Sequence, residues 1–215
     1  MSEVKILKQD IMPVDALPLY KEETDFVLTK DELDVVLNEK CEQGDGGTDV
    51  KISTTDNLLK NEKLQRVKTF ILSRFNHYVE NVLMIENCFY LTQSWSAINE
   101  KGSNHHLHVH PNTVLTCVYY AAANPDSGNE LHLKWTKSRL QEAFFFSYKR
   151  KNFNIFNSPS TVLKVKTGDI VMFPGWINHK SLENKSDEKR IIIGTNYFVM
   201  GKLGTFEHKD YIEVG

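Results

Sequence analysis

Cysteine is scarce in this chain of 215 residues, which has only three, at positions 41, 88 and 117. Their number is odd, they lie far apart and they form no C-x-x-C pair, so the sequence predicts neither a disulfide framework nor a thiolate zinc site. Disulfides are also unnecessary, because a chain of this length can bury most of its apolar surface in one domain. We therefore expect a protein of the reducing cytoplasm.

Charge excess and long apolar runs are also missing. The formal net charge is -2, with 25% charged residues, so the chain has no basic field of the kind that attracts nucleic acid. The N-terminus MSEVKILKQD has no apolar core of signal-peptide length, and the sequence has no run of about 18 apolar residues that could span a bilayer. We expect neither nucleic acid nor a membrane as a partner.

Residues 1–83 are predicted to form an N-terminal helical buttress. Thr29 and Glu32 have the spacing of a capping box at the start of a short helix. The glycine-rich segment 42–49 is typical of a turn or a mobile loop. A longer helix is expected to begin near Asn61, because apolar residues recur there at spacings of three and four as far as Val82.

From about residue 84 the pattern becomes that of short strands separated by Gly, Pro, Asn or Asp. The segments are CFYLTQSWSAIN, TVLTCVYYAAA, NELHLKW, TVLKVK, DIVMF and RIIIGTNYFVM. They predict a mainly β, antiparallel jelly-roll barrel over residues 84–200, in a single domain with the helices packed outside and a C-terminal tail at 201–215. Segment 136–160, with Phe144–Phe146, is too long for an ordinary turn and predicts a lid or an additional pair of strands.

Histidine is the residue type that this sequence concentrates. Four of the eight histidines lie within the segment 105–110, and His179 follows downstream in GDIVMFPGWINH. Imidazole is the commonest ligand for borderline metals, so the cluster predicts a metal site. A solvent-facing tract that binds metal incidentally is the alternative. The isolated histidines at 77, 132 and 208 are expected to be ordinary surface or core residues.

Two H-x-H pairs compete as metal ligands, and His108 belongs to both. Strand alternation puts His106, His108 and His110 on one face and His105 on the other. Two imidazoles at i and i+2 can meet one ion at about 2.0 to 2.1 Å from each nitrogen. The strand is expected to end at Pro111, directly after His110, where barrel sites open. We therefore favour the pair His108 and His110 over His106 and His108, and expect His105 and His106 to support the site or to be structural.

Arg190 is the candidate for binding an anion. It begins the strand RIIIGTNYFV eleven residues after His179, and a guanidinium there can hold a carboxylate through two parallel hydrogen bonds. A surface charge at a strand start is the alternative, which the preceding His179 disfavours.

The order H-x-H, then GDIVMFP with His179, then Arg190 resembles that of the iron(II)- and 2-oxoglutarate-dependent oxygenase superfamily. More narrowly, HVHPN followed by VYY looks like a poorly characterised branch that is loosely similar to prolyl hydroxylases. The resemblance covers about residues 90–200. It implies a double-stranded β-helix, related to the jelly roll, with Fe(II), 2-oxoglutarate and O2 as cofactor and cosubstrates.

The resemblance also implies roles for individual residues. His108 matches the first metal ligand and His179 the distal one, while Arg190 matches the residue that pairs with the C5 carboxylate of 2-oxoglutarate. The superfamily usually has Asp or Glu where this chain has His110. Three further residues could complete the 2-oxoglutarate pocket through hydrogen bonds, with structural roles as equal alternatives: Asn112, Tyr120 and Asn196.

The histidine at position 110 leaves three possibilities for the third ligand. We favour His110 itself, because its spacing is right. The alternatives are a carboxylate from a neighbouring loop, such as Asp126 or Glu130, and a water or halide. No catalytic residue beyond the metal ligands is expected.

The implied function is that of a hydroxylase, which couples 2-oxoglutarate decarboxylation to hydroxylation of a C–H bond in an unknown small-molecule or peptidyl substrate. One alternative is a three-histidine, cupin-type metal dioxygenase that does not use 2-oxoglutarate, in which Arg190 would be dispensable. The other is a non-catalytic metal-binding barrel, which would not couple metal binding to 2-oxoglutarate binding.

Overall fold

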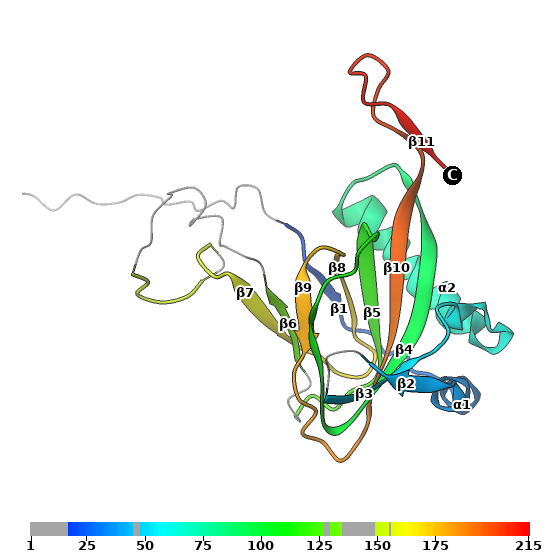
Figure 1. Ribbon diagram of the computed structural model, residues 1–215, viewed down its shortest axis with the longest axis vertical. Coiled ribbons are helices and arrows are strands. Elements are labelled where there is room, and N and C mark those ends of the chain that lie inside the picture. Colours follow the sequence, from blue (N-terminus) through cyan, green and yellow to red (C-terminus); the bar gives the residue numbers. More distant parts are fainter. Residues whose placement is uncertain (1–16, 45–47, 127–129, 135–148, 155) are drawn as a thin grey trace, which may run out of the picture.

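The computed structural model describes residues 17–44, 48–126, 130–134, 149–154 and 156–215. Its strands are β1 (Tyr20–Glu22), β2 (Cys41–Gln43), β3 (Thr48–Ser53), β4 (Cys88–His108), β5 (Leu115–Ala122), β6 (Glu130–Lys134), β7 (Ser160–Lys164), β8 (Ile170–Pro174), β9 (Asn178–Ser181), β10 (Arg190–Leu203) and β11 (Ile212–Val214). They form one curled sheet in the order β1-β8-β5-β10-β4-β9-β6-β7, which β2, β3 and β11 extend at its sides (Figure 1). All six predicted strand segments are present.

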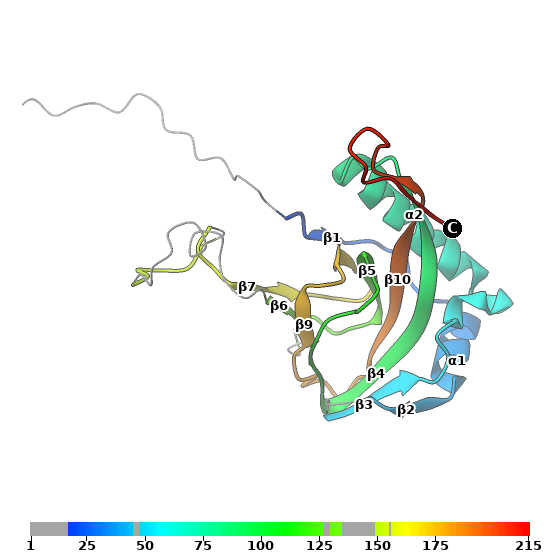
Figure 2. The same cartoon turned by 45° about the horizontal axis from the view of Figure 1, so that its top comes forward.

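Strand β4 joins the two halves of this sheet. Its first half pairs with β10 as far as Asn99, which lies opposite Arg190, and its end pairs with β9, where His108 lies opposite His179. Between these two regions Gly102 has a φ of 84°, a left-handed conformation that glycine adopts without strain and that helps β4 to change direction. The histidine-rich end of β4 thereby reaches the smaller group of strands β9, β6 and β7 (Figure 2).

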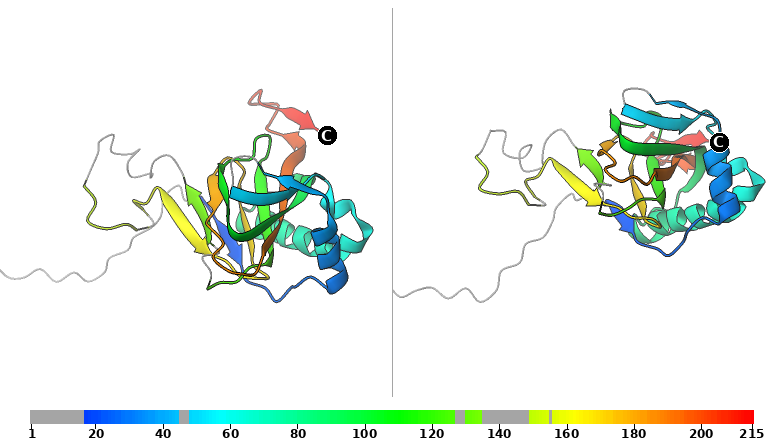
Figure 3. Two further views of the ribbon diagram at one scale, coloured as in Figure 1. Left: turned by 60° about the horizontal axis from the view of Figure 1, so that its bottom comes forward. Right: turned by 90° about the horizontal axis from the view of Figure 1, so that it is seen from below.

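Both predicted helices lie on the outer side of the large sheet (Figures 2 and 3). Helix α1 (Lys30–Asn38) begins with the predicted capping box, in which the side chains of Thr29 and Glu32 accept from each other's backbone N–H. Helix α2 (Gln65–His77) follows two 3-10 turns at 58–64 and continues into a π-helical turn at Tyr78–Val82. None of the helices in the described part of the chain is long and apolar enough to cross a membrane.

Apolar side chains form two cores, one on each face of the large sheet. Tyr119 of β5 and Ile193 of β10 belong to the outer core under the helices. Val118 and Tyr120 of β5, with Phe173 of β8, belong to the inner core inside the barrel. Because successive side chains of a strand point to opposite faces, this division identifies the residues that face the interior.

The structure adds short strands to both segments that flank the predicted barrel. The N-terminal segment is more than a helical buttress, since β1 pairs with β8 and β3 pairs with β4. The predicted C-terminal tail is partly ordered, since β10 continues to Leu203 and pairs there with β11. These strands are short, and their place depends on a partner strand.

The segment predicted as a lid lies mostly outside the described residues. Residues 135–148, which include Phe144–Phe146, and residue 155 are not described. The flanking strands β6 and β7 pair antiparallel, with Glu130 opposite Lys164 and Lys134 opposite Ser160. The segment thus connects two strands of one hairpin, and its role as a lid stays a prediction.

Candidate metal centre

Three histidines converge where the end of β4 meets β9. His108 lies opposite His179, and His110 follows β4 by two residues. One nitrogen from each imidazole can be chosen so that all three lie within 4.8 Å of one another. The ring centroids of His108 and His179 are 4.2 Å apart, and those of His110 and His179 are 4.8 Å apart. The fold thus brings together the three residues that the sequence predicted as metal ligands.

Backbone carbonyls determine the tautomer of two of these rings. His108 Nδ1 lies 2.8 Å from the carbonyl oxygen of His106, and His179 Nδ1 lies 2.9 Å from that of Ile177. A carbonyl oxygen can only accept, so Nδ1 carries the proton in both rings. Each Nε2 therefore keeps the lone pair that a metal ion requires.

Side chains give His110 the same tautomer. His110 Nδ1 lies 2.7 Å from Asn196 Oδ1 and 3.0 Å from Thr116 Oγ1. The Asn196 amide is oriented by Gln93, because Asn196 Nδ2 donates to Gln93 Oε1 at 2.9 Å. The amide oxygen therefore faces the ring and accepts its proton. Asn196, which the sequence predicted for the 2-oxoglutarate pocket, thus contacts a candidate metal ligand.

We expect Asn196→Ala to weaken metal binding by roughly ten- to hundredfold, the usual cost of losing a partner that orients a ligand histidine. The substitution removes the acceptor of His110 Nδ1–H and leaves all three ligand imidazoles in place. Asn196→Asp is the matched control, because it keeps an oxygen acceptor, and it should bind nearly as tightly as the wild type. Calorimetric titration with Co2+ measures both variants in a His106→Ala background, and equal affinities for Asn196→Ala and its parent would refute the role.

Burial keeps the three histidines neutral. Burial and, next, repulsion from His108 lower the pKa of His110 to about 4. Burial also lowers the pKa of His108 and holds that of His179 well below its usual value. Neutral imidazole is the form that binds metal, so at neutral pH the site is ready to bind without releasing protons.

The metal-free protein should lose stability as the pH falls from about 6.5 towards 4. Histidines of the unfolded chain take up protons near pH 6.5, whereas folded His110 does so only near 4. The unfolded state therefore binds more protons in this window, and the free energy of unfolding should fall by up to about 1.4 kcal/mol per pH unit for each such histidine. Urea unfolding at pH 7 and pH 5 measures the slope. His110→Ala should make it shallower, and an unchanged slope would contradict this expectation.

Arg190 is buried on the same side of the barrel. It is 1% exposed, its Nη2 donates to Ser181 Oγ at 2.9 Å and its Nη1 donates to the carbonyl of Leu182 at 3.0 Å. Ser181 lies two residues beyond His179 on β9, a separation of about 7 Å along a strand. A five-carbon dicarboxylate can bridge a distance of this order between the histidines and the guanidinium.

A buried donor without an acceptor lies beside Arg190. Asn99 is 2% exposed, and its Oδ1 accepts from Arg190 Nε at 3.4 Å. Its Nδ2 has no hydrogen-bond partner among the residues that the structure describes. Leaving a buried N–H unpaired costs about 1 to 3 kcal/mol, so this amide and the guanidinium together suit an anion. Asn99 could not be identified from the sequence, because its place beside Arg190 depends on the register of β4 and β10.

Of the two other predicted pocket residues, Tyr120 faces the interior and Asn112 does not. Tyr120 is 3% exposed in the inner core. Burial raises its pKa, and the nearby positive charge of Arg190 opposes that rise, so the phenol and the guanidinium are neighbours.

Asn112 lies exposed in the turn after His110 with a φ of 56°, a conformation that asparagine tolerates. The turn accounts for this asparagine, and its contact with 2-oxoglutarate stays a prediction.

Within the described residues, groups of three potential metal ligands contain histidine alone. Asp126 lies in an exposed turn after β5, and Glu130 begins β6 opposite Lys164. Neither carboxylate joins His108 and His179 in such a group. This arrangement supports His110 as the third ligand, which remains a prediction.

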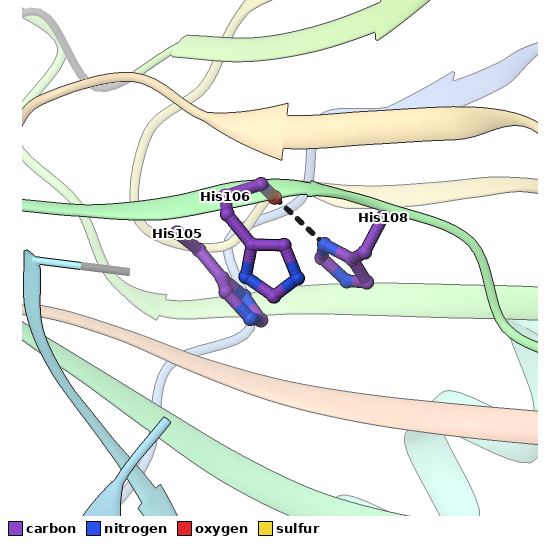
Figure 4. Close-up of side chains that lie close together, drawn as sticks. All are labelled: His105, His106 and His108. Atoms are coloured by element: carbon purple, nitrogen blue, oxygen red, sulfur yellow. Dashed lines mark hydrogen bonds between the residues drawn. The ribbon is translucent and has the colours of Figure 1, made fainter. Parts of the chain in front are cut away.

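His105 does not point away from the other histidines, contrary to the prediction from strand alternation. The register between β4 and β9 shifts between His105 and His108, and the two rings lie 4.2 Å apart. Figure 4 shows the rings of His105, His106 and His108 on one side of the strand. Periodicity cannot predict this, because an irregularity of pairing changes the alternation locally.

Trp95 forms a wall of the site beside His110. The two rings meet edge to face, with centroids 5.3 Å apart and planes at 72°. Gly194 lies opposite Trp95 on β10, and a Cβ atom at this glycine would collide with the indole. The glycine therefore leaves room for the indole against β10.

Comparison with known proteins agrees with this geometry. Residues 93–196 match the family model described as putative 2OG-Fe(II) oxygenase. No curated protein matches the chain in sequence. Among solved structures, a Pseudomonas putida prolyl-4-hydroxylase is 11% identical with a TM-score of 0.55, covering 86% of this chain and 94% of its own.

Two further structures extend the likeness. A Trichoplax adhaerens prolyl hydroxylase, in complex with a hypoxia inducible factor peptide fragment, is 16% identical with a TM-score of 0.55 and covers 84% of this chain and 83% of its own. HygX from Streptomyces hygroscopicus, with nickel, 2-oxoglutarate and hygromycin B bound, is 12% identical with a TM-score of 0.55 and covers 85% of this chain and 83% of its own.

The match to the putative 2OG-Fe(II) oxygenase model covers residues 93–196, a little less than half of the chain, and the fold is shared with the solved structures named above. They confirm the predicted superfamily, the double-stranded β-helix and the class of enzyme. Fe(II) and 2-oxoglutarate, with O2 as cosubstrate, are the cofactors of this class, and the histidine triad and the anion pocket at Arg190 fit them.

Proposed function

We propose that this protein is a hydroxylase that holds Fe(II) with His108, His110 and His179 and 2-oxoglutarate with Arg190. One observation carries the proposal: three imidazoles meet with each Nδ1 engaged and each Nε2 available, and the buried Arg190 guanidinium bonds to Ser181, which lies two residues beyond His179 on β9. Neither a structural histidine cluster nor a surface arginine explains this combination.

Bound iron and 2-oxoglutarate supply the oxidising chemistry, in which decarboxylation to succinate and CO2 is coupled to hydroxylation of a C–H bond by O2. The chain provides the geometry. His108, His110 and His179 would hold the metal, and positions that they do not occupy would remain for the cosubstrate and O2. Arg190 and Asn99 bind and orient the distal carboxylate, and Phe173, whose ring lies 4.8 Å from that of His179, helps to exclude water from the inner side.

A histidine at position 110, where the superfamily usually has a carboxylate, changes the charge of the site. With three neutral ligands the metal keeps its full formal charge of +2, instead of the +1 that two histidines and one carboxylate would leave. A more positive centre beside a buried guanidinium favours a doubly negative cosubstrate. His110 is therefore compatible with 2-oxoglutarate as the cosubstrate. Electrostatic attraction then makes up a larger share of the binding of 2-oxoglutarate.

The substrate proposed for this chain is a small molecule or a peptidyl side chain. Proteins of this fold have been solved with either kind, a hypoxia inducible factor peptide fragment in one and hygromycin B in another. Strand β6 of the β6–β7 hairpin lies beside the histidines, with Leu133 opposite His179. The three cysteines are free thiols, which supports a cytoplasmic location.

Turnover of 2-oxoglutarate tests the proposal. Purified protein with Fe(II), 2-oxoglutarate and O2 should form succinate, detected by proton NMR, at a slow rate even without the natural substrate. His179→Ala should abolish this turnover, and His208→Ala, which changes an exposed histidine of the C-terminal hairpin, should leave it unchanged. Absence of iron-dependent succinate from the wild type, or equal rates in wild type and His179→Ala, would refute the function.

A further inference from the structure

A second group of histidines shares one residue with the metal centre. We propose that His105, His106 and His108 form an alternative site for a divalent metal ion, which cannot be filled while the first site is filled. One nitrogen from each of these rings can be chosen so that all three lie within 4.8 Å of one another, as in the first group. The ring centroids are 4.2 Å apart for His105 and His108, and 5.1 Å apart for the other two pairs.

The local structure of β4 brings these neighbours together. Consecutive residues of a regular strand point to opposite faces, but here the register against β9 shifts between His105 and His108. The backbone N–H of His105 donates to Ser181 Oγ at 2.9 Å, which anchors the irregular segment to β9. As a result the imidazoles of His105, His106 and His108 gather in one place (Figure 4).

His106 provides independent evidence that the group suits a ligand. Its Nδ1 is buried and has no hydrogen-bond partner in the described part of the chain. The corresponding atoms of His108 and His110 are both bonded. A buried imidazole nitrogen without a partner is costly, and a metal ion close to His105 and His108 would satisfy it.

The two groups exclude each other because His108 has one nitrogen to offer. Its Nδ1 donates to the carbonyl of His106, so only Nε2 can bind either ion. Without His108 the second group is reduced to two ligands. The wild-type chain should therefore hold one ion at a time. Three imidazoles and a water suit ions such as Zn2+ and Co2+ in tetrahedral coordination.

Two double variants distinguish this site from the first. His110→Ala with His179→Ala removes two ligands of the first group and leaves the second complete. His106→Ala with His179→Ala removes the same number of histidines and leaves neither group complete. Titration with Co2+ alone, followed by its visible d–d absorption, reports both affinity and tetrahedral geometry. This experiment uses neither 2-oxoglutarate nor turnover, so its failure is separate from failure of the proposed function.

We expect the first double variant to bind one Co2+ per chain with a tetrahedral spectrum, and the second to bind at least tenfold more weakly. Equal affinities for the two double variants, or no binding by a folded first variant, would overturn the proposal. Circular dichroism checks folding. If alanine at positions 110 and 179 prevents folding, asparagine at both keeps a donor near each Nδ1 position, and the same comparison applies.

Discussion

Replacing His108 with alanine should abolish both metal binding and turnover of 2-oxoglutarate. His108 belongs to both groups of histidines, so its loss leaves no complete set of three ligands. Loss of a residue that merely supports a ligand costs roughly ten- to hundredfold in metal affinity, and loss of this ligand should cost more than that. Calorimetry with Co2+ and succinate formation with Fe(II) measure the two effects.

Comparison with His179→Ala makes the His108 experiment specific. That substitution removes the first site and leaves His105, His106 and His108 in place, so it should lose turnover and retain binding of one Co2+. His208→Ala, far along the chain and exposed, should behave as the wild type in both assays. Wild-type affinity for Co2+ in a folded His108→Ala protein would contradict the assignment of this residue.

Arg190→Lys should weaken 2-oxoglutarate binding by about thirtyfold or more. Loss of one partner from a buried, hydrogen-bonded charge pair costs about 2 to 5 kcal/mol, and each 1.4 kcal/mol is about a factor of ten. Lysine keeps the positive charge but cannot donate in parallel to a carboxylate, and it gives up bonds to Ser181 and Leu182. The KM for 2-oxoglutarate should therefore rise, with little change in affinity for the metal.

Lys189→Met is the matched control for this experiment. Lys189 is the neighbouring cation, and it pairs on the surface with Glu100 at 3.1 Å. Its loss should leave the KM for 2-oxoglutarate within about twofold, because exposed ion pairs contribute little. An unchanged KM for 2-oxoglutarate in Arg190→Lys would contradict the assignment of Arg190 to the carboxylate of 2-oxoglutarate.

The sequence was sufficient to predict the barrel and which histidines meet in it. Short segments separated by turn residues identified β4, β5, β8 and β10, and the apolar runs of β5 and β8 supply side chains to both cores. The order of His108, His179 and Arg190 carried the family resemblance, and the fold brings the first two together. These predictions depend on local pattern and on order along the chain, which a sequence contains.

Features that depend on register between strands were not predictable. Strand β9 has the polar sequence NHKS and is held in place by β4 and β6. Gln93 and Asn196 act as a unit only because they are cross-strand partners on β4 and β10. Asn99 reaches Arg190 for the same reason. The convergence of His105 with His108 requires an irregularity of pairing that no periodicity indicates.

Anaerobic titration of the wild-type protein with Fe(II) and 2-oxoglutarate tests the central claim most directly. Chelation of 2-oxoglutarate by protein-bound iron produces a weak visible metal-to-ligand absorption band. The band should appear only when both are present and saturate at one 2-oxoglutarate per chain. It should require a higher concentration of 2-oxoglutarate in Arg190→Lys and be absent in His179→Ala. A wild-type protein that binds Fe(II) but shows no such band would contradict the account.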